Sequence, residues 1–223
     1  MNAVERRPGT GALGVAEPQP VVYVVDDDVS LREALQAMVA ESGFRPEVFA
    51  SAQEFLKHAR QPVPSCLILD MSLPDLNGLE VQRLVGTGQT TLPIVFITGH
   101  GDIPMTVEAM KAGATEFLTK PFSPEALLAA VVSAVEHSRT HLEEQRTLQM
   151  LKDRRETLSR RERDVMALVT RGQLNKQVAA ALGISEITVK AHRGKVMRKM
   201  KARTLADLLT MAARLRADSG ERG

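Results

Sequence analysis

The stretch Leu67-Ile68-Leu69-Asp70 determines the fold that we predict for this chain. Its three consecutive apolar residues predict a strand buried on both faces, because they are too few and too continuous for an amphipathic helix. The turn residues of segment 71–78 then end the strand. Open parallel sheets bind their ligands at the carboxyl ends of strands, so we expect Asp70 to be a reacting carboxylate.

Other strand-like runs along the chain also end in polar residues. In chain order these residues are Asp26, Asp27 and Asp28, then Thr98, and finally Lys120. Strand-like and helix-like segments alternate through residues 21–135, and five of each predict an α/β fold whose parallel sheet is covered on both faces. Because the strand ends of such a sheet lie at one edge, we interpret these polar residues as one phosphoryl-transfer site.

Capping boxes mark the starts of several predicted helices. The box that begins at Ser30 predicts a helix whose inner face carries Leu31, Ala34, Leu35 and Met38. Similar start signals stand at Ser51, Ser159 and Thr204.

The residue types at the strand ends fit an aspartyl-phosphate site. Asp70 is a competent nucleophile toward phosphorus, and Mg²⁺ bound by Asp26 and Asp27 would neutralise the clustered negative charge. Lys120 supplies a cation for a phosphate oxygen, and Thr98 supplies a hydroxyl that can hydrogen-bond it. Taken singly, each residue also fits a turn, a strand position or a solvated charge, and only their joint occurrence favours the site.

The two halves of the chain carry opposite charge. Residues 1–136 hold 9 Lys and Arg against 17 Asp and Glu, a net of −8, whereas residues 137–223 hold 20 against 10, a net of +10. This division predicts metal or phosphate chemistry in the first half and a polyanionic partner for the second. The single Cys66 forms no intramolecular disulfide, and no apolar run reaches the length of a membrane span, so we expect a cytoplasmic protein with no membrane partner.

The basic half contains a helix-turn-helix pattern, with helices predicted over 175–182 and 186–200. The residues that we expect on the inner face of the second helix are Ile187, Val189, Val196 and Met200. Its outer face is basic, which by itself also fits a solvated charged surface, but the charge division and the helix-turn-helix spacing favour duplex DNA. No aromatic residue follows Phe122, and a stacking platform for single strands would need aromatic residues.

The strand-end residues resemble the signature of bacterial response-regulator receiver domains. The matching positions are Asp26-Asp27, Asp70, Thr98 and Lys120-Pro121. The resemblance covers residues 21–138 and implies a flavodoxin-like, doubly wound sheet of five parallel strands. It further implies that a sensor histidine kinase phosphorylates Asp70 and that the Lys120–Pro121 peptide bond is cis.

The same resemblance assigns metal and switch residues. Those that would hold Mg²⁺ are Asp27, Asp70 and Ser72, the last through its backbone carbonyl, with Asp26 assisting. Phe117 falls at a position where an aromatic ring turns inward together with Thr98 after phosphorylation. Core packing explains a phenylalanine at this position equally well, so both interpretations of Phe117 stay open.

Three segments of the basic half resemble LuxR/NarL-type DNA-binding domains, namely 158–163, 175–179 and 182–192. The resemblance implies a four-helix domain that dimerises through its last helix. It implies base contacts from Lys190 and Ala191, with neighbouring contacts from Arg193 and Lys195. The phosphate contacts that it implies are Asn175, Lys176, Thr188 and Lys199. Gly194 departs from the pattern, because related proteins often carry a DNA-contacting side chain there.

The whole chain is therefore identified as a member of the FixJ-like branch of two-component transcription regulators. The domains that we predict are a disordered tail over 1–20, the receiver over 21–138, a helical linker over 139–157, the LuxR-type helix-turn-helix domain over 158–216 and a tail over 217–223. A linker helix would thus join an α/β receiver to an all-α output domain.

The expected partners follow from this assignment. They are a sensor histidine kinase, double-stranded promoter DNA and a second copy of the chain, with RNA polymerase as a further candidate. We expect phosphorylation of Asp70 to favour a receiver state that dimerises through a surface around 102–111, 117–119 and 124–135. We expect dimerisation through this surface because it contains a run of apolar residues, namely Leu127, Leu128, Val131, Val132 and Val135.

Two alternatives come from other functional classes. Asp26-x-Asp28-x-Ser30 roughly fits the first motif of haloacid-dehalogenase-type phosphatases, but the later acidic pair of that family is not matched after Thr98. A phosphorylation-independent DNA binder with a vestigial receiver is disfavoured, because no expected site residue is missing. We therefore expect a regulator and not an enzyme, with only self-phosphorylation and self-dephosphorylation at Asp70.

Overall fold

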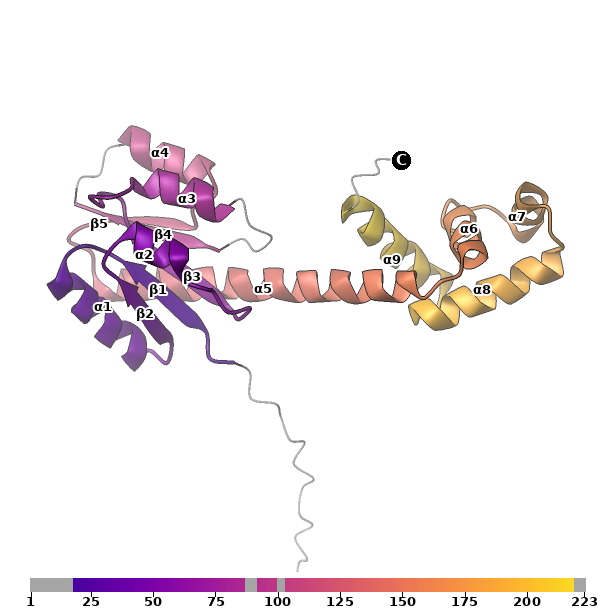
Figure 1. Cartoon of the computed structure of the whole chain (residues 1–223), viewed down its shortest axis with the longest axis horizontal. Helices are drawn as coiled ribbons and strands as arrows, with labels where there is room; N and C mark the ends of the chain where they lie inside the picture. The colour runs from indigo at the N-terminus through magenta and orange to yellow at the C-terminus, as the bar shows by residue number, and fades with distance from the viewer. Residues whose placement is uncertain (1–17, 87–91, 100–102, 219–223) are drawn as a thin grey trace, which may run out of the picture. The chain divides into compact units, whose positions relative to one another are not determined.

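The computed structural model describes residues 18–86, 92–99 and 103–218, which fold into two compact units (Figure 1). The N-terminal unit extends to Leu142, and the C-terminal unit begins at Glu143. Most of the two predicted tails lies outside the described residues. None of the helices in the described part of the chain combines the length and the apolar composition that crossing a membrane requires.

Five parallel strands form the sheet of the N-terminal unit. They are β1 (Val21–Val25), β2 (Arg45–Phe49), β3 (Ser65–Asp70), β4 (Ile94–Thr98) and β5 (Glu116–Thr119). Their order across the sheet is β2-β1-β3-β4-β5, which is the flavodoxin-like order and confirms the predicted fold class. Because β3 pairs with a strand on each side, Asp70 emerges from the middle of the carboxyl edge.

Five helices cover the two faces of this sheet. They are α1 (Val29–Glu41), α2 (Ala52–Lys57), α3 (Gly78–Gly86), α4 (Ile103–Lys111) and α5 (Pro124–Glu156). Alternate residues of each strand point to opposite faces, so Cys66 and Ile68 meet α1 and α5 while Leu67 and Leu69 meet α2, α3 and α4 (Figure 1). Cys66 is fully buried in this layer, and burial raises the pKa of its thiol to about 12. We therefore expect this thiol to be unreactive.

Helix α1 begins one residue before the predicted capping box. Its N-cap is Asp28, whose Oδ1 accepts hydrogen bonds from the backbone N–H groups of Ser30 (2.9 Å) and Leu31 (3.3 Å). The prediction of Ser30 as the cap is therefore wrong, because Asp28 already satisfies the first amides of the helix. Ala34 is exposed, and Val39 takes a place in the core that the predicted inner face did not include.

Helix α5 runs without a break from Pro124 to Glu156, through the position where the composition of the chain changes. Its apolar run does not form the exposed surface that we expected. Leu127, Val131 and Val135 follow each other at intervals of four residues and are buried against the sheet. Val132 is the member of this run that is largely exposed.

The C-terminal unit contains the end of α5 and four further helices. These are α6 (Arg160–Val169), α7 (Asn175–Leu182), α8 (Glu186–Met200) and α9 (Leu205–Asp218). The predicted bounds of α7 and α8 are confirmed. Two apolar clusters share α6 and α8, one of them with α5 and α9 and the other with α7. Helix α8 is thereby held along its whole length.

The prediction that Ile187 faces inward is wrong. Val189, Val196 and Met200 are buried, whereas Ile187 is 80% exposed. Ile187 precedes Val189 by only two residues, which corresponds to about 200° around a helix, so the two side chains lie on opposite faces.

Gly78 begins α3 at a place where its backbone lies close to two other residues. A Cβ at this position would lie 2.9 Å from Sδ of Met71, 3.1 Å from Cα of Met71 and 3.0 Å from Cε1 of Phe96. The segment that follows Asp70 is therefore packed against β4 by a contact that leaves no space for a side chain.

Gly78→Ala should lower the free energy of unfolding of the N-terminal unit by about 1–3 kcal/mol, because the added methyl group overpacks this contact. Gly86→Ala, at the other end of the same helix, meets nothing within 4 Å and should be neutral or slightly stabilising. Urea unfolding followed by the fluorescence of Tyr23, the single Tyr in a chain without Trp, measures this unit. Equal effects of the two substitutions would contradict the tight contact at Gly78.

Candidate functional site

Lys120 joins two carboxylates at the carboxyl edge of the sheet. Its Nζ donates hydrogen bonds to Oδ2 of Asp70 (2.7 Å) and to Oδ2 of Asp26 (2.9 Å). Asp26 follows β1, Asp70 ends β3 and Lys120 follows β5, so the structure brings together residues from three strands. The Lys120–Pro121 peptide bond is cis, as the resemblance to receiver domains implies.

Burial and charge act against each other in this cluster. Burial raises the pKa of the fully buried Asp26 carboxyl, while hydrogen bonds from Lys120 and from the N–H of Asp28 oppose the rise. Burial alone would lower the pKa of the Lys120 ammonium, but its hydrogen bonds to Asp70 and Asp26 outweigh that effect and the net pKa is raised. Lys120 is therefore a cation at neutral pH, which is the charge that a phosphoryl oxygen requires.

Asp27 adds a third carboxylate, and this one is exposed. One carboxylate oxygen each from Asp26, Asp27 and Asp70 lies within 4.8 Å of the other two. Such a cluster of oxygen donors matches the ligands that Mg²⁺ prefers. Ser72 lies beside it, because its N–H donates to Oδ1 of Asp70 (2.9 Å). The carbonyl ligand implied by the sequence thus belongs to a residue that already contacts Asp70.

Asp28 has a different role from its two acidic neighbours. Its carboxylate caps α1, as described above, and it is not part of the group of carboxylates that could hold a metal ion. This arrangement disfavours the phosphatase alternative, whose first motif would include Asp28 together with Asp26.

Thr98 and Phe117 lie on the two strands that follow β3 in the sheet. Thr98 is buried at the end of β4, one residue beyond Ile97, the register partner of Asp70. Phe117 in β5 is partly buried, and its ring centroid lies 6.3 Å from that of Phe96. This contact fits the core-packing interpretation of Phe117, and its switch role stays a prediction.

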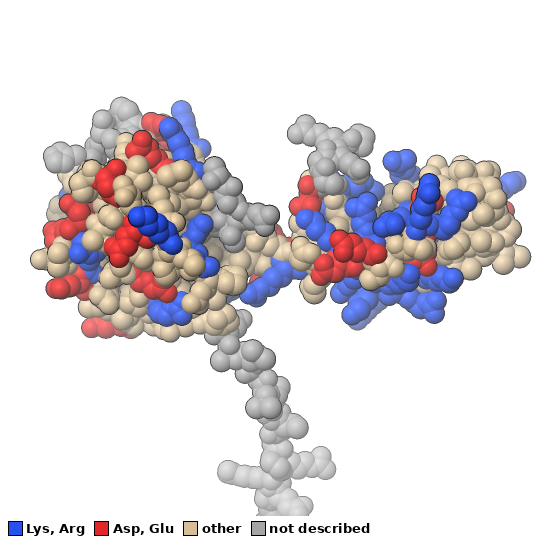
Figure 2. Space-filling model, viewed as in Figure 1, with Lys and Arg blue, Asp and Glu red and all other residues tan. Residues whose placement is uncertain are grey.

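The outer surface of α8 carries several of the residues predicted to contact DNA. Lys190, Ala191 and Lys195 are exposed. Arg193 is partly buried, and its Nη1 donates to Oδ1 of Asn175 (2.6 Å) at the start of α7, so two of the predicted contacts form a pair. Figure 2 shows Lys and Arg side chains gathered on the C-terminal unit.

Two further predicted contacts, Lys176 and Thr188, lie in the first turns of α7 and α8. Lys176 is exposed in the first turn of α7. The backbone N–H of Thr188 donates to Oγ of Ser185 (3.1 Å), and the two hydroxyl oxygens lie 2.8 Å apart. Ser185 thus caps α8 and fixes the orientation of its first turn.

Lys199 is placed differently from the other predicted phosphate contacts. Its Nζ donates to Oε2 of Glu162 (2.7 Å) and to the carbonyl oxygen of Thr157 (2.8 Å). The same Oε2 accepts the N–H of Ser159 (2.8 Å) and completes the predicted capping box. Sequence reasoning missed this ion pair, because the capping box predicts the contact of Glu162 with Ser159 but neither its burial nor its approach to Lys199. A phosphate contact would require the Lys199 amine to leave Glu162.

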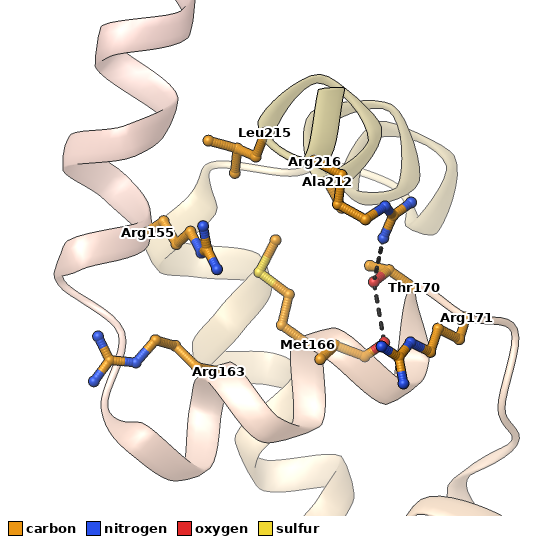
Figure 3. Close-up of a pocket in the computed structure, with 9 residues that line it drawn as sticks. Arg155, Arg163, Met166, Thr170, Arg171, Ala212, Leu215 and Arg216 are labelled. Atoms are coloured by element: carbon orange, nitrogen blue, oxygen red, sulfur yellow. Dashed lines mark hydrogen bonds between the residues drawn. The ribbon is translucent and has the colours of Figure 1, made fainter. Parts of the chain in front are cut away.

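A cavity of about 110 Å³ opens between α6 and α9 (Figure 3). The arginines in its lining are Arg155, Arg163, Arg171 and Arg216. Nη1 of Arg216 donates to Oγ1 of Thr170 (3.3 Å), which in turn donates to the carbonyl oxygen of Ala167 (3.3 Å). The described residues that line this cavity include none from α8 and none of those predicted to contact DNA, so the cavity is separate from that predicted surface.

Two family models match the chain, one on each unit. Residues 22–132 match the response regulator receiver domain, and residues 156–212 match the bacterial regulatory proteins of the luxR family.

Proteins that cover nearly the whole chain are similar to it. Nodulation protein W of Bradyrhizobium diazoefficiens is 51% identical over 93% of this chain and 91% of its own, and the transcriptional regulatory protein FixJ of Rhizobium meliloti is 40% identical over 86% and 94%. A solved structure of the response regulator StyR has 44% identity and a TM-score of 0.78 over 88% of this chain and 100% of that chain. Full-length FixJ from B. japonicum has 36% identity and a TM-score of 0.51 over 87% and 96%.

Replacement of Lys120 should destabilise the N-terminal unit through its two carboxylates. Lys120→Met leaves Asp26 and Asp70 without their cation, and we expect the free energy of unfolding to fall by about 1–3 kcal/mol in the absence of divalent metal. The double variant Lys120→Met/Asp70→Asn should recover part of this loss, because one of the two like charges is removed. Urea unfolding with Tyr23 fluorescence measures both changes. A further loss in the double variant would contradict this account of the cluster.

The capping box of α6 should make the stability of the C-terminal unit depend on pH. Hydrogen bonds from Lys199 and from the N–H of Ser159 lower the pKa of Glu162. A carboxyl whose pKa is lowered by folding contributes stability above its unfolded pKa of about 4.3, and that contribution disappears as the pH falls through the folded value. The difference between wild type and Glu162→Gln should therefore be present at pH 7 and shrink below about pH 4.3.

Helical circular dichroism during thermal unfolding measures this difference. Asp164→Asn is the matched control on the same helix, because Asp164 is partly exposed and pairs with Arg161 only at 3.8 Å. We expect Asp164→Asn to change the free energy of unfolding by no more than about 0.5 kcal/mol, both at pH 7 and below about pH 4.3. A difference between wild type and Glu162→Gln that stays constant from pH 7 down to about pH 3 would argue against the charge of Glu162 as the cause.

Proposed function

The chain belongs to the FixJ-like response regulators, which join a receiver domain to a LuxR-type DNA-binding domain, and we propose that phosphorylation of Asp70 by a sensor histidine kinase controls its binding to promoter DNA. The family makes it a phosphorylation-regulated transcription regulator. The observation that supports Asp70 as the acceptor is the contact of its carboxylate with Lys120, beside Asp26 and Asp27.

In the proposed transfer, a carboxylate oxygen of Asp70 forms a bond to phosphorus while the bond between phosphorus and the imidazole nitrogen of the kinase histidine breaks. The electron pair of the broken bond stays on that nitrogen, and an acyl phosphate forms on Asp70. The carboxylate is oriented beforehand, since Oδ1 accepts the N–H of Ser72 and Oδ2 accepts Nζ of Lys120. Most of phosphoryl-transfer catalysis consists of such positioning and charge stabilisation.

The carboxylate cluster fits Mg²⁺ as the cofactor. The residues that would hold it are Asp26, Asp27, Asp70 and the backbone carbonyl of Ser72. When bound, Mg²⁺ would neutralise charge on the carboxylates and on the oxygens of the phosphoryl group. The exposed position of Asp27 leaves the cluster open to solvent, where an ion and a phosphodonor can reach it.

Lys120 and Thr98 are the proposed detectors of the phosphoryl group. As the group arrives, Lys120 exchanges a carboxylate oxygen for a phosphoryl oxygen, and the Thr98 hydroxyl turns to hydrogen-bond another. Phe117 would follow Thr98, because the two residues lie on the neighbouring strands β5 and β4. The ring of Phe117 contacts that of Phe96, which precedes Thr98 by two residues on β4. The proposed outcome is a shift in population between two receiver states.

The proposed receiver spans 21–138, the linker 139–157 and the DNA-binding domain 158–216. The continuity of α5 supports a linker that continues the last receiver helix, since Pro124–Glu156 is one helix. The exposed basic side chains of α8 support duplex DNA as the ligand of the output domain.

Dimerisation on phosphorylation is proposed for two surfaces. On the receiver it would use exposed apolar side chains of α4 and α5, namely Val107, Met110 and Val132. On the output domain it would use α9, which exposes Leu205 and Leu209. Apolar side chains exposed on neighbouring turns are typical of protein interfaces. Asp102, at the start of the predicted dimer surface, lies outside the described residues.

Incubation of the full chain with Mg²⁺ and acetyl phosphate should add one phosphoryl group, detected by intact mass. Asp70→Asn should abolish the adduct, and removal of the metal with EDTA should suppress it. Asp75→Asn is the matched control in the same loop, because the carboxylate of Asp75 accepts the N–H of Gln53 (2.9 Å) and is not part of the acidic cluster.

The same samples test the read-out by light scattering and by binding to duplex DNA. The proposal expects dimerisation and tighter DNA binding only where Asp70 is phosphorylated. An adduct that persists in Asp70→Asn would move the nucleophile elsewhere. Tight DNA binding without any adduct would support a constitutive DNA binder.

A further inference from the structure

Ile187 is the most exposed of the large apolar side chains in the described part of the chain, with 80% of its surface accessible. Single apolar residues on a protein surface are common and by themselves carry no meaning. The position of Ile187 is what requires an explanation, because it lies in the first turn of the second helix of the helix-turn-helix. Residues at this end of the second helix contact base edges when such a unit binds DNA.

The first turn of α8 is fixed in a way that presents Ile187 outward. Ser185 caps the helix through the N–H of Thr188, and Val189 on the opposite face is completely buried. The helix therefore cannot rotate to bury Ile187 without exposing Val189. The side chain is held away from the C-terminal unit at the surface where a ligand of α8 would lie.

The residues that share a face with Ile187 make this surface narrow. Lys190, Ala191 and Gly194 follow it at intervals of three, four and seven residues, so they form one stripe along the helix. Ala191 carries only a methyl group, and a Cβ at Gly194 would meet nothing within 4 Å. Small residues let the helix approach a groove closely, and the ammonium of Lys190 suits the acceptor atoms of a base edge within that groove.

We infer that Ile187 is a specificity-determining residue that packs against the 5-methyl group of a thymine in the major groove. The inference rests on the proposed binding of duplex DNA. Among the four bases, thymine alone offers an apolar group at the major-groove edge. Ile187 has no hydrogen-bonding atoms in its side chain, so it distinguishes bases by this methyl group and not by their donors and acceptors.

The test begins with the phosphorylated full chain and a random-sequence duplex library, from which tightly bound duplexes are selected. Each thymine of a selected duplex is then replaced in turn by deoxyuridine, which differs only in lacking the 5-methyl group. For wild type, one position in each half-site should be sensitive to the replacement. A single deoxyuridine there should weaken binding about fourfold, which corresponds to the loss of one buried methyl-sized group. Ile187→Ala should bind the thymine and deoxyuridine duplexes equally at that position.

Two further variants separate this contact from general effects on folding or charge. Ile187→Val keeps a branched apolar side chain and should retain part of the preference for thymine. Lys176→Ala, at an exposed residue predicted to contact phosphate, should weaken binding to both duplexes and lower the slope of log affinity against log salt by about one, whereas Ile187→Ala should leave that slope unchanged.

Three results would overturn the inference. One is an equal deoxyuridine penalty in wild type and Ile187→Ala, and another is a wild type that tolerates deoxyuridine at every position. In both cases the protein still binds DNA, so the proposed function would stand without this contact. Failure to select any duplex with the phosphorylated chain would overturn the proposed DNA binding and the inference together.

Discussion

The contact of the Lys120 ammonium with the carboxylates of Asp26 and Asp70 is the interaction on which the N-terminal unit depends. A fully buried carboxylate such as Asp26 is tolerated only when a cation and hydrogen bonds compensate its loss of water. The cation comes from the end of β5, at one edge of the sheet, and the carboxylates come from the ends of β1 and β3. The strand order contributes to the site as well as to the fold, because it places the ends of β1 and β3 side by side, within reach of the Lys120 side chain.

In the C-terminal unit, one face of helix α8 is packed, and the face for which we propose DNA recognition lies opposite it. Val189 reaches one apolar cluster while Val196 and Met200 reach the other, and these contacts fix which residues point outward. Glu162 adds a second constraint, since it ties the end of α8 to the start of α6 through Lys199. A recognition surface on this helix is thus defined by the buried residues behind it.

Sequence patterns predicted the sheet and the residues at its carboxyl edge, because a buried strand and the turn after it can each be recognised from a few consecutive residues. Local patterns were less reliable wherever two candidates competed. Asp28 and Ser30 are both good helix caps, and the structure uses the one that follows β1 more closely. Ile187 was predicted to lie in the core because its side chain is apolar. Its spacing of two residues from Val189 places the two side chains on opposite faces of the helix, and Ile187 is exposed. The pairing of Lys199 with Glu162 depends on tertiary structure, and no spacing in the sequence indicates it.

The burial of Cys66 has a practical consequence for following this protein in solution. It is the single cysteine of the chain, and its high pKa keeps it a neutral thiol with little reactivity at neutral pH. A maleimide dye will therefore modify a cysteine introduced on the surface in preference to the native one. The wild-type background is already suited to attaching a fluorophore pair, one on each unit, and to recording their separation with and without a phosphodonor.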